Sequence, residues 1–585
     1  MRYFVSSRSH NARLIWMTGA LAAALGVVGL RLIHLQLVGA SHLRALARQQ
    51  HQVAIALPPM RGALLDRHRH PLAESILVQS VYADPRHVAD APAVARRLAP
   101  ILRVEASTLR KQLTQPKGFV WLARHIEPDQ ADRVRALQLR GVWLTSEPKR
   151  RYPGGELASH ALGFTDIDQV GLEGLELFYE PLLRGERGWR KTLRDGRGRE
   201  LWGLWLDRRP AKTGCSLVLT LDRMLQHVAE RELEQAYRST RAKGGSIILL
   251  DPATGAIRAL ANRPAFDLAR PQQASLEGHR NRAITDVNEP GSVFKVIAAS
   301  ALLEEGLITL GERIDCEQGE MRVAGGHVIH DVHPYGSLTF HDVIQYSSNI
   351  GTIKAAQRLG IERLHRYVRA FGFGEVTGVD LPGEVQGLVR PLQRWSKSSM
   401  NAVPIGHEVG VTAVQTACAL AVIANGGRWV KPHLLSTILD SEGRTIEQAR
   451  PVSRRVLSEA TAKAVGAMLA SVVDRGTGKL ARVKGYTAAG KTGTAQKLEA
   501  DGRYSHSKFV AAFAGFVPAE DPQLVIVVML DEPRGAYYGG VVAAPVFSRV
   551  AREAMRYLEV PASVPPMPAL QTAAPTRPPP PRERR

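Results

Sequence analysis

An uncharged apolar run near the N-terminus constrains this chain more than any other feature. Residues 14–30 read LIWMTGALAAALGVVGL, and beyond Arg31 the apolar pattern continues to Val38. As a helix the run spans roughly 26 Å at about 1.5 Å per residue, and its continuation makes it long enough for a ~30 Å hydrocarbon core. The sequence therefore predicts a transmembrane anchor over residues 14–38. A cleaved signal peptide is the alternative, although the run is longer than the usual apolar core of a signal.

Charge on the two sides of the anchor decides its orientation only weakly. Arginines both precede and follow the span, and no acidic residue occurs before Asp66. A long domain after one N-terminal span usually crosses the membrane whatever its charge. We therefore expect residues 1–13 to be cytoplasmic and the bulk of the chain to lie on the periplasmic side of the inner membrane.

The composition is that of a globular protein with an excess of basic residues. Among 585 residues, 77 Lys and Arg against 55 Asp and Glu give a net charge of +22, which predicts an anionic neighbour such as nucleic acid, acidic lipid or an acidic polymer. Outside the inner membrane, lipid or wall polymer is the expected counter-charge and nucleic acid is not. Cys215, Cys316 and Cys418 are too few and too widely spaced for a disulfide framework or a CxxC metal site.

Changes in composition divide the rest of the chain. Residues 39–215 are rich in arginine and turn signals, and Asp207–Gly214 resembles a linker. Residues 216–560 carry alternating strand and helix patterns, whereas residues 561–585 contain nine prolines and too little apolar bulk to fold. We expect a loop-rich domain, a second globular domain and a disordered tail.

The pattern within residues 216–560 predicts an α+β fold. Apolar strand patterns occur at both ends, and alanine-rich helical segments lie between them. Asp222 precedes a helical run through Leu233 and is suited to cap it. This order favours an antiparallel sheet packed against a helical subdomain. The predicted strands are 217–219, 246–250, 256–260, 509–517 and 524–530, and the alanine-rich helices are 296–303, 350–359 and 412–423.

Ser292 and Lys295 are the first candidate catalytic pair. Pro290-Gly291 ends the preceding structure, so Ser292 is expected in the first turn of a helix with Lys295 on the same face. A serine hydroxyl needs a neighbouring base to become a nucleophile, and a lysine serves as that base when burial or a nearby cation lowers its pKa. Alone, this spacing also fits an ordinary helix start.

Two further polar motifs follow along the chain. Ser347 and Asn349 open a helix and offer a hydroxyl and an amide for proton relay and substrate orientation. The segment Lys491-Thr492-Gly493-Thr494 places a fixed positive charge and two hydroxyls on a strand that a ligand can approach closely. Each motif alone also fits a helix cap or an edge strand. In this order, however, S-x-x-K, S-x-N and K-T-G are associated with penicillin-binding proteins and serine β-lactamases.

The likeness extends beyond these motifs. The chain resembles the class B penicillin-binding proteins, and within them the division-specific peptidoglycan D,D-transpeptidases of the FtsI type, over nearly everything except the tail. The resemblance implies one anchor, an elongated pedestal domain (residues 39–215) and a transpeptidase domain (residues 216–560) with a serine β-lactamase-like fold. The matching segments are Arg61-Gly62, Asp66-Arg67, Pro71–Ala73, Arg151–Glu156, His160, Gly163–Thr165, Gly171–Gly174, Asn281–Asp286, Gly476–Gly478, Asp501–Tyr504, Tyr537–Gly540 and Ala544–Phe547.

The resemblance also implies how a peptide would be cleaved. Ser292 would be acylated by the penultimate D-Ala of a stem peptide, with loss of the terminal D-Ala. Lys295 would be the base, and Ser347 and Asn349 would relay the proton and hold the peptide. An amine of a neighbouring stem would then form the cross-link, and β-lactams would acylate the same serine.

Substrate binding is implied for the third motif. Lys491 and Thr492 would help bind the terminal carboxylate, with Gly493 and Thr494 in the same strand. The oxyanion hole would use the backbone N–H groups of Ser292 and Thr494. No metal or organic cofactor is required, and the implied partners are peptidoglycan stem peptides, the cytoplasmic membrane, a membrane glycosyltransferase and other division proteins.

Some positions depart from the family pattern. Arg69 stands where the turn after Asp66-Arg67 usually has glycine, which puts the local pedestal geometry in doubt. Gly406-His407-Glu408 replaces a Gly-x-Gly, so the back of the active site is expected to differ. One loop has the residue types of a zinc site, but its spacing does not place them on one strand face and polar loop residues are the default interpretation. Its members are His327, His330, Asp331 and His333.

Several alternative functions stay open from the sequence. An elongation-specific transpeptidase is the close alternative, although Tyr537–Gly540 and the overall length favour the division type. A β-lactamase needs a base for the deacylating water, and the sequence offers no clear candidate. A β-lactam sensor needs a cytoplasmic output domain, for which residues 1–13 leave no room. A mainly non-catalytic division scaffold is compatible with the same anchor and pedestal.

Overall fold

The computed structural model divides the chain into two compact units. One comprises residues 1–60 and 185–213, and the other comprises residues 61–184 and 214–585. Residues of the predicted pedestal therefore occur in both units, and its boundary with the transpeptidase domain stays a prediction. The structure describes residues 7–38, 40–43, 52–194, 200–323, 328–396, 398–499, 501 and 503–563, so most of the predicted tail lies outside the described residues.

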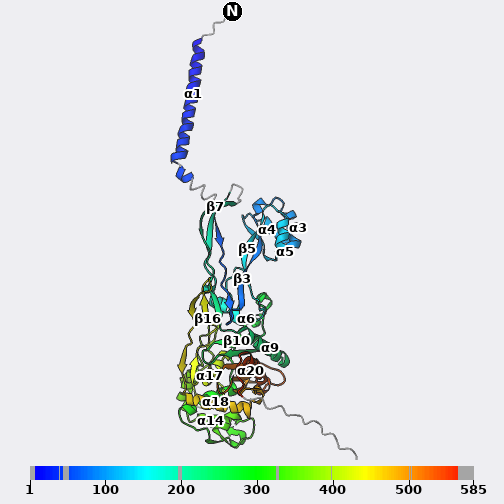
Figure 1. The fold of residues 1–585 in the computed structure, drawn as a ribbon, viewed down its shortest axis with the longest axis vertical. Coiled ribbons are helices and arrows are strands. Elements are labelled where there is room, and N and C mark those ends of the chain that lie inside the picture. The colour runs from blue at the N-terminus through cyan, green and yellow to red at the C-terminus, as the bar shows by residue number, and fades with distance from the viewer. Residues whose placement is uncertain are drawn as a thin grey trace, which may run out of the picture. The chain divides into compact units, whose positions relative to one another are not determined.

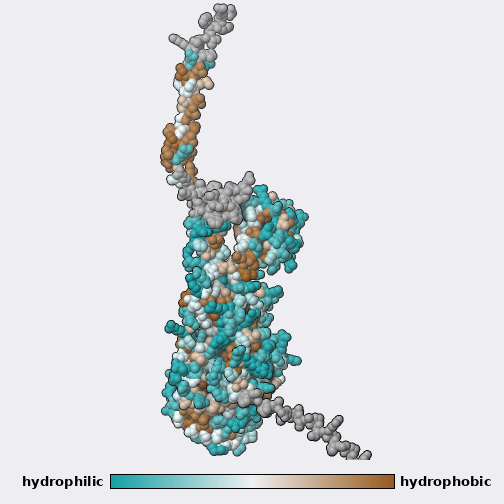
Figure 2. All heavy atoms as spheres, viewed as in Figure 1, coloured by the Kyte–Doolittle hydropathy of each residue, from teal (hydrophilic) through white to brown (hydrophobic). Residues whose placement is uncertain are grey.

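The first unit begins with a long apolar helix. Helix α1 (Ser7–Ile33) continues into a π-helical turn, η1 (His34–Val38), and its apolar side chains are exposed, as its brown surface in Figure 2 shows. The segment Asn11–Val38 has a mean hydropathy of 1.8 and is long and apolar enough to cross a membrane. Its end agrees with the predicted anchor, and an exposed apolar surface of this kind fits association with a membrane.

A three-stranded antiparallel sheet completes the first unit, in the order β1-β6-β7. The predicted linker is wrong in its first part, because Asp207–Arg209 are strand residues that pair with Trp189–Lys191. These residues are exposed, so the strand lacks the apolar alternation by which sequence reasoning finds a strand. The strands are β1 (Gln52–Leu57), β6 (Gly188–Arg194) and β7 (Glu200–Arg209).

The N-terminal part of the second unit is built on one long strand, β3 (Pro71–Ala83), which pairs with β2, β4 and β5. Three helices cover one face of this sheet through a core that includes Val81, Leu98 and Leu109. These elements are β2 (Leu64–Leu65), β4 (Val120–Ile126), β5 (Val142–Arg151), α3 (Ala91–Leu102), α4 (Ala106–Leu113) and α5 (Pro128–Ala136). The same sheet continues through β8 (Ser216–Leu219), β16 (Leu435–Leu439) and β17 (Thr445–Gln448).

A buried ion cluster lies in this part of the unit. The side chain of Glu176 is fully buried and accepts hydrogen bonds from Arg61 Nε at 2.6 Å and Arg150 Nε at 2.7 Å. Arg61 also donates to Glu180, and Arg150 also donates to the Gly62 carbonyl at 2.8 Å. The cluster joins segments far apart in the sequence, and its charges are paired inside the protein.

Arg69 adopts the left-handed conformation for which the family uses glycine, with φ of +65°. Its N–H donates to the Asp66 carbonyl at 2.9 Å, and the Asp66 carboxylate accepts the backbone N–H groups of His68 and His70, each at 2.8 Å. The turn is therefore closed by its own hydrogen bonds with an arginine in the glycine position.

The second unit also contains a five-stranded antiparallel sheet in the order β10-β9-β21-β20-β19. Figure 1 labels its strand β10. The two strand pairs predicted from sequence are confirmed, and β10 and β19 are the edge strands of this sheet. Alternate residues of β9 face opposite cores, which explains its unbroken apolar run. The strands are β9 (Gly244–Leu250), β10 (Ile257–Arg263), β19 (Ala489–Leu498), β20 (Tyr504–Val517) and β21 (Leu524–Asp531).

Helices pack on both faces of this sheet, so the predicted α+β architecture is confirmed. Helices α9 and α20 contact one face, and α17 and α18 contact the other. Asp222 caps α9 by accepting the N–H groups of Met224 and Leu225, but the helix runs to Thr240 instead of ending at Leu233. The longer helices are α9 (Arg223–Thr240), α12 (Lys295–Glu304), α14 (Asn349–Ala356), α15 (Gly360–Ala370), α17 (Ala413–Ala424), α18 (Glu459–Asp474) and α20 (Ala544–Tyr557).

Candidate active site

Ser292 lies where the sequence predicts it, in a short turn that opens a helix. The turn is the 3-10 helix η4 (Gly291–Phe294), which leads directly into α12. Ser292 is partly exposed, whereas Gly291, Val293 and Phe294 are buried. Gly291 has φ of +52°, a conformation that glycine adopts without steric cost.

Strand β19 packs directly against this turn. A Cβ atom on Gly493 would lie 2.9 Å from the Pro290 carbonyl oxygen and from Val293 Cγ2, and one on Gly291 would lie 3.1 Å from the Thr494 carbonyl oxygen. Both positions therefore need glycine for the close approach. The structure thus brings the predicted K-T-G strand beside the predicted nucleophile.

Lys295 is fully buried and has three acceptors around its amine. Nζ donates to the Ser347 carbonyl at 2.6 Å, to Ser347 Oγ at 3.2 Å and to Asn349 Oδ1 at 2.7 Å. Burial lowers the pKa of Lys295 well below its ordinary value, the charge of Lys491 lowers it further, and Asp331 opposes them. No hydrogen bond within the described part of the chain joins Lys295 to the Ser292 hydroxyl.

Lys491, on β19, approaches the hydroxyl of Ser347, which Lys295 also contacts. Its Nζ lies 2.9 Å from Ser347 Oγ, its side chain is completely buried, and burial lowers its pKa to about 7. Burial therefore disfavours the ammonium form of Lys491, and its role as a fixed positive charge for a carboxylate stays a prediction. A bound carboxylate would favour the ammonium form.

The S-x-N motif is held in place by His330, the last residue of strand β13 (Val328–His330), and by Asp331, which follows it. Ser347 has φ of +64°, and Asn349 Nδ2 donates to the His330 carbonyl at 2.8 Å. Asp331 accepts the Ser348 hydroxyl and the Asn349 N–H, both at 2.5 Å, and the Ile350 N–H at 3.1 Å. Asp331 therefore caps α14 from outside the helix, in a role that no helical periodicity announces.

The threonines of the third motif face neighbouring segments. The hydroxyls of Thr492 and Thr477 lie 2.9 Å apart, and Thr494 Oγ1 accepts the Gly539 N–H at 3.0 Å. Thr477 belongs to the segment Gly476–Gly478, which matched the family in sequence but was not predicted to be a site residue. The contact with Thr492 places it at the same strand.

The loop with zinc-ligand residue types uses them otherwise. Asp331 caps α14, and the ring of His333 packs against Tyr335 with centroids 5.8 Å apart. Among the described residues no group of three His, Cys, Asp or Glu could hold a metal, and His327 lies outside them.

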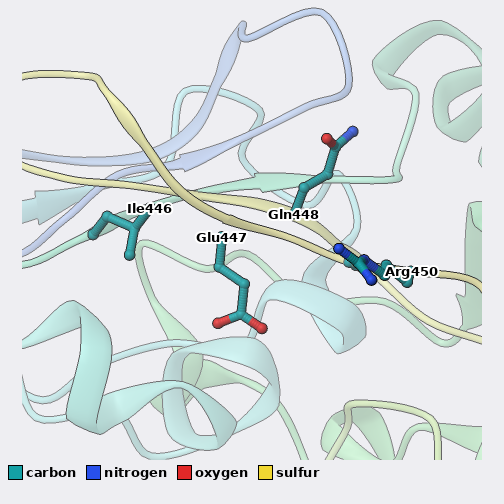
Figure 3. Close-up of a pocket in the computed structure, with 5 residues that line it drawn as sticks. Ile446, Glu447, Gln448 and Arg450 are labelled. Atoms are coloured by element: carbon teal, nitrogen blue, oxygen red, sulfur yellow. The ribbon is translucent and has the colours of Figure 1, made fainter.

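A hollow of about 600 Å³ lies away from these motifs, along β17 (Figure 3). Its described lining consists of Ile446, Glu447, Gln448, Ala449 and Arg450, and in Figure 3 Glu447 and Gln448 point to opposite sides of the strand. It contains none of the predicted site residues and no group suited to act as a nucleophile.

Two protein-family models match the chain. Residues 245–552, slightly more than half of the chain, match the penicillin-binding protein transpeptidase domain. Residues 56–219 match the penicillin-binding protein dimerisation domain. This chain belongs to the penicillin-binding proteins. In this penicillin-binding protein, Ser292, Lys295, Ser347, Asn349 and the β19 strand all lie within the transpeptidase match.

Curated and solved relatives agree with this assignment. The chain is 35% identical to "Probable peptidoglycan D,D-transpeptidase PenA" of Neisseria meningitidis, over 94% of this chain and 93% of the relative. It is 35% identical to "Peptidoglycan D,D-transpeptidase FtsI" of Escherichia coli, over 86% and 84%. Penicillin-binding protein 3 of Mycobacterium tuberculosis, solved with aztreonam, superposes with a TM-score of 0.68 at 31% identity, over 87% and 99%.

These comparisons confirm the predicted family and reaction class. The penicillin-binding protein described here is a class B peptidoglycan D,D-transpeptidase, a serine-type acyl-transfer enzyme. Its substrate is peptidoglycan, and its apolar N-terminal helix associates it with a membrane.

Proposed function

We propose that this enzyme cross-links septal peptidoglycan through an acyl-enzyme on Ser292. The observation that carries the assignment of the nucleophile is the arrangement beside it, where Lys295 and Lys491 converge on Ser347 Oγ and β19 packs against the serine turn. A partly exposed serine hydroxyl one helical turn before a buried lysine is an arrangement suited to serine acylation.

Acylation begins with attack of Ser292 Oγ on the carbonyl carbon of the penultimate D-Ala. The serine proton passes to the free amine of Lys295, directly or through the hydroxyl of Ser347. Burial of Lys295 supports this step because it favours the neutral amine. Collapse of the tetrahedral intermediate breaks the peptide bond and releases the terminal D-Ala as an amine that takes up the proton.

The K-T-G strand binds the end of the donor peptide. Lys491 and Thr492 face the terminal carboxylate, and the backbone N–H groups of Ser292 and Thr494 stabilise the oxyanion. The amide of Asn349 orients the peptide with the N–H that is not engaged by His330. Gly493 contributes by letting the strand approach the serine turn closely.

The acyl-enzyme is released by an amine of a neighbouring stem peptide, which forms the cross-link. Water in place of the amine would make the enzyme a carboxypeptidase, a hydrolytic side reaction of the same intermediate. Penicillin would acylate the same serine, and slow release of that adduct would separate this proposal from a β-lactamase.

The sequence supports the proposed role in division and the proposed orientation in the membrane. The resemblance to the FtsI type supports a septal enzyme, with an elongation-specific transpeptidase as the alternative. We assign the transpeptidase domain to the periplasmic side of the inner membrane, anchored by residues 14–38, next to a membrane glycosyltransferase that makes the glycan. The net charge of +22 then has acidic lipid or wall polymer as its counter-charge rather than nucleic acid.

Intact-mass analysis after exposure to penicillin tests the assignment. One adduct is expected, mapped to the peptide that contains Ser292, and S292A should stay unmodified. Label on another residue would overturn the site. Complementation of a division-defective strain separates catalysis from scaffolding, since S292A should reach the septum without supporting division. Growth with S292A would favour the scaffold, and rescue of an elongation defect instead would favour the alternative role.

A further inference from the structure

The segment Val403–Val411 lies along the back of the serine turn. Asn288 and Val411 exchange both backbone hydrogen bonds, at 3.0 and 2.8 Å, and the Gly291 N–H donates to the Gly406 carbonyl at 3.2 Å. A Cβ atom on Gly406 would lie 2.1 Å from the Gly291 carbonyl oxygen. The two backbones therefore touch, and a change in one segment is transmitted to the other.

The carboxylate of Glu289, three residues before Ser292, is held from two further segments. His407 Nδ1 lies 2.6 Å from Oε2, and the Glu408 N–H donates to Oε1 at 2.9 Å. Tyr504 Oη lies 3.0 and 3.1 Å from the two carboxylate oxygens. An ionised carboxylate only accepts, so His407 carries its proton on Nδ1 in this contact. Hydrogen bonds to a charged acceptor are the stronger kind.

Tyr504 connects the carboxylate of Glu289 to the strand pair β19–β20, which carries the K-T-G motif. It is the first residue of β20, which pairs with β19 along Ala489–Leu498. Its ring meets that of His407 edge to face, with centroids 5.4 Å apart. Glu289, His407 and Tyr504, which we call the clasp, therefore tie the serine turn to the strand pair that carries Lys491.

Glu408 supports the clasp in a conformation unusual for its residue type. Its φ is +58°, and its side chain accepts the Ser399 hydroxyl at 2.8 Å, with Arg390 at 3.9 Å. A non-glycine residue stays in the left-handed region when its surroundings fix it there. The sequence Gly406-His407-Glu408, which departs from the family, is thus built into the contact with Glu289.

We propose that His407 is a positioning residue, which fixes the Ser292 turn relative to β19 by holding the carboxylate of Glu289 together with Tyr504. The proposal rests on the assignment of Ser292 as nucleophile. His407 does not touch the reacting atoms, so its loss should slow the acylation step and leave the initial capture of a β-lactam intact.

The full-length enzyme and three variants test the clasp, with penicillin as the probe. H407F keeps a ring against Tyr504 but has no donor for Glu289, whereas H407N keeps a donor near the position of Nδ1. We expect H407F to lower the first-order acylation rate constant about tenfold, as for loss of one charge-assisted hydrogen bond, with the dissociation constant of the initial complex within about twofold. H407N should recover most of the rate. H365F, at a histidine packed on Trp395, is the matched control.

Hydrogen exchange provides a readout that does not depend on activity. Amides of residues 288–296 should exchange faster in H407F than in the wild type, and H407N should restore protection. Should H407F fail to fold, Y504F removes one hydroxyl from the same carboxylate and should change rate and exchange in the same direction.

The proposal would be overturned if H407F had the acylation rate and the hydrogen exchange of the wild type. It would also be overturned if H407N and H407F lost the same amount of acylation rate and protection. A wild-type enzyme that is not acylated at Ser292 would instead count against the proposed nucleophile, and the exchange measurement would still decide the clasp.

Discussion

Lys295 and Lys491 share one acceptor, the hydroxyl of Ser347, at Nζ–Oγ distances of 3.2 and 2.9 Å. Two ammonium groups on one oxygen repel, and burial opposes the charge of both. Lys295 experiences both effects, whereas the pKa of Lys491 is lowered by burial alone. The geometry therefore favours a free amine on Lys295 and the proton on Lys491, which supports the proposed roles of Lys295 as base and Lys491 as carboxylate-binding group.

The rate of acylation should accordingly depend on pH on both sides of neutrality. At low pH Lys295 becomes protonated and can no longer take up the serine proton, whereas at high pH Lys491, whose pKa burial lowers to about 7, loses its proton. We expect the second-order rate constant for a β-lactam to follow a bell-shaped profile. The first-order rate constant for acylation of the bound complex should stay high to a higher pH, because the bound carboxylate stabilises the Lys491 ammonium. Equal rates from about pH 5 to about pH 10 would contradict this assignment.

Replacing Lys491 by methionine should stabilise the protein while abolishing carboxylate binding. The folded pKa of about 7 lies below the ordinary value of 10.5, so between these values the unfolded chain binds the proton that the native state sheds. The wild-type free energy of unfolding therefore rises with pH through this window, and K491M removes that dependence. At neutral pH we expect K491M to gain about 1–3 kcal/mol, with acylation by penicillin lost.

Thermal unfolding at several pH values measures this effect. K463M, at an exposed lysine on α18, should change the melting temperature little at any pH. If K491M had a lower melting temperature than the wild type at neutral pH, the contacts of Lys491 would stabilise the fold by more than the burial of its amine destabilises it.

Local spacing let the sequence predict that Ser292 and Lys295 meet, and the order of the S-x-x-K, S-x-N and K-T-G motifs pointed to the other candidate site residues. The sequence did not predict which groups hold these residues in place. Ser292 and Lys295 are one turn apart, so helix geometry alone brings them together. Asp331 and Tyr504 reach the site from distant segments, and an isolated aspartate or tyrosine has no periodicity to mark it. The end of α9 was missed for a related reason, since most of its residues after Leu233 are polar and only Ala236 among them is buried.

Asp331 should support catalysis through the S-x-N turn. D331N keeps the size of the side chain, but its amide cannot accept all three donors from Ser348, Asn349 and Ile350. We expect acylation to fall about tenfold, as for one unsatisfied buried donor. Because Asp331 raises the pKa of Lys295, its loss should also move the acid limb of the pH profile to lower pH.

A matched control separates this effect from loss of a helix cap. Asp90 caps α3 by accepting the Ala93 N–H at 2.9 Å, in the N-terminal part of the same unit. D90N should lower stability by about 1 kcal/mol or less without altering acylation. An unshifted acid limb in D331N would mean that Asp331 acts on stability alone.

The buried carboxylate of Glu176 should be the most sensitive single position in the N-terminal part of the second unit. Arg61 and Arg150 both donate to it, and a glutamine there would have to direct its NH₂ group at one of two guanidinium groups that cannot accept. Removing one partner of a buried ion cluster leaves charge without compensation, so we expect E176Q to lose about 3–5 kcal/mol of unfolding free energy. D132N, in the exposed pair with Arg135, should lose less than about 1 kcal/mol. Denaturant unfolding compares the two variants, and similar small losses in both would mean that the arginines find other acceptors when Glu176 is neutral.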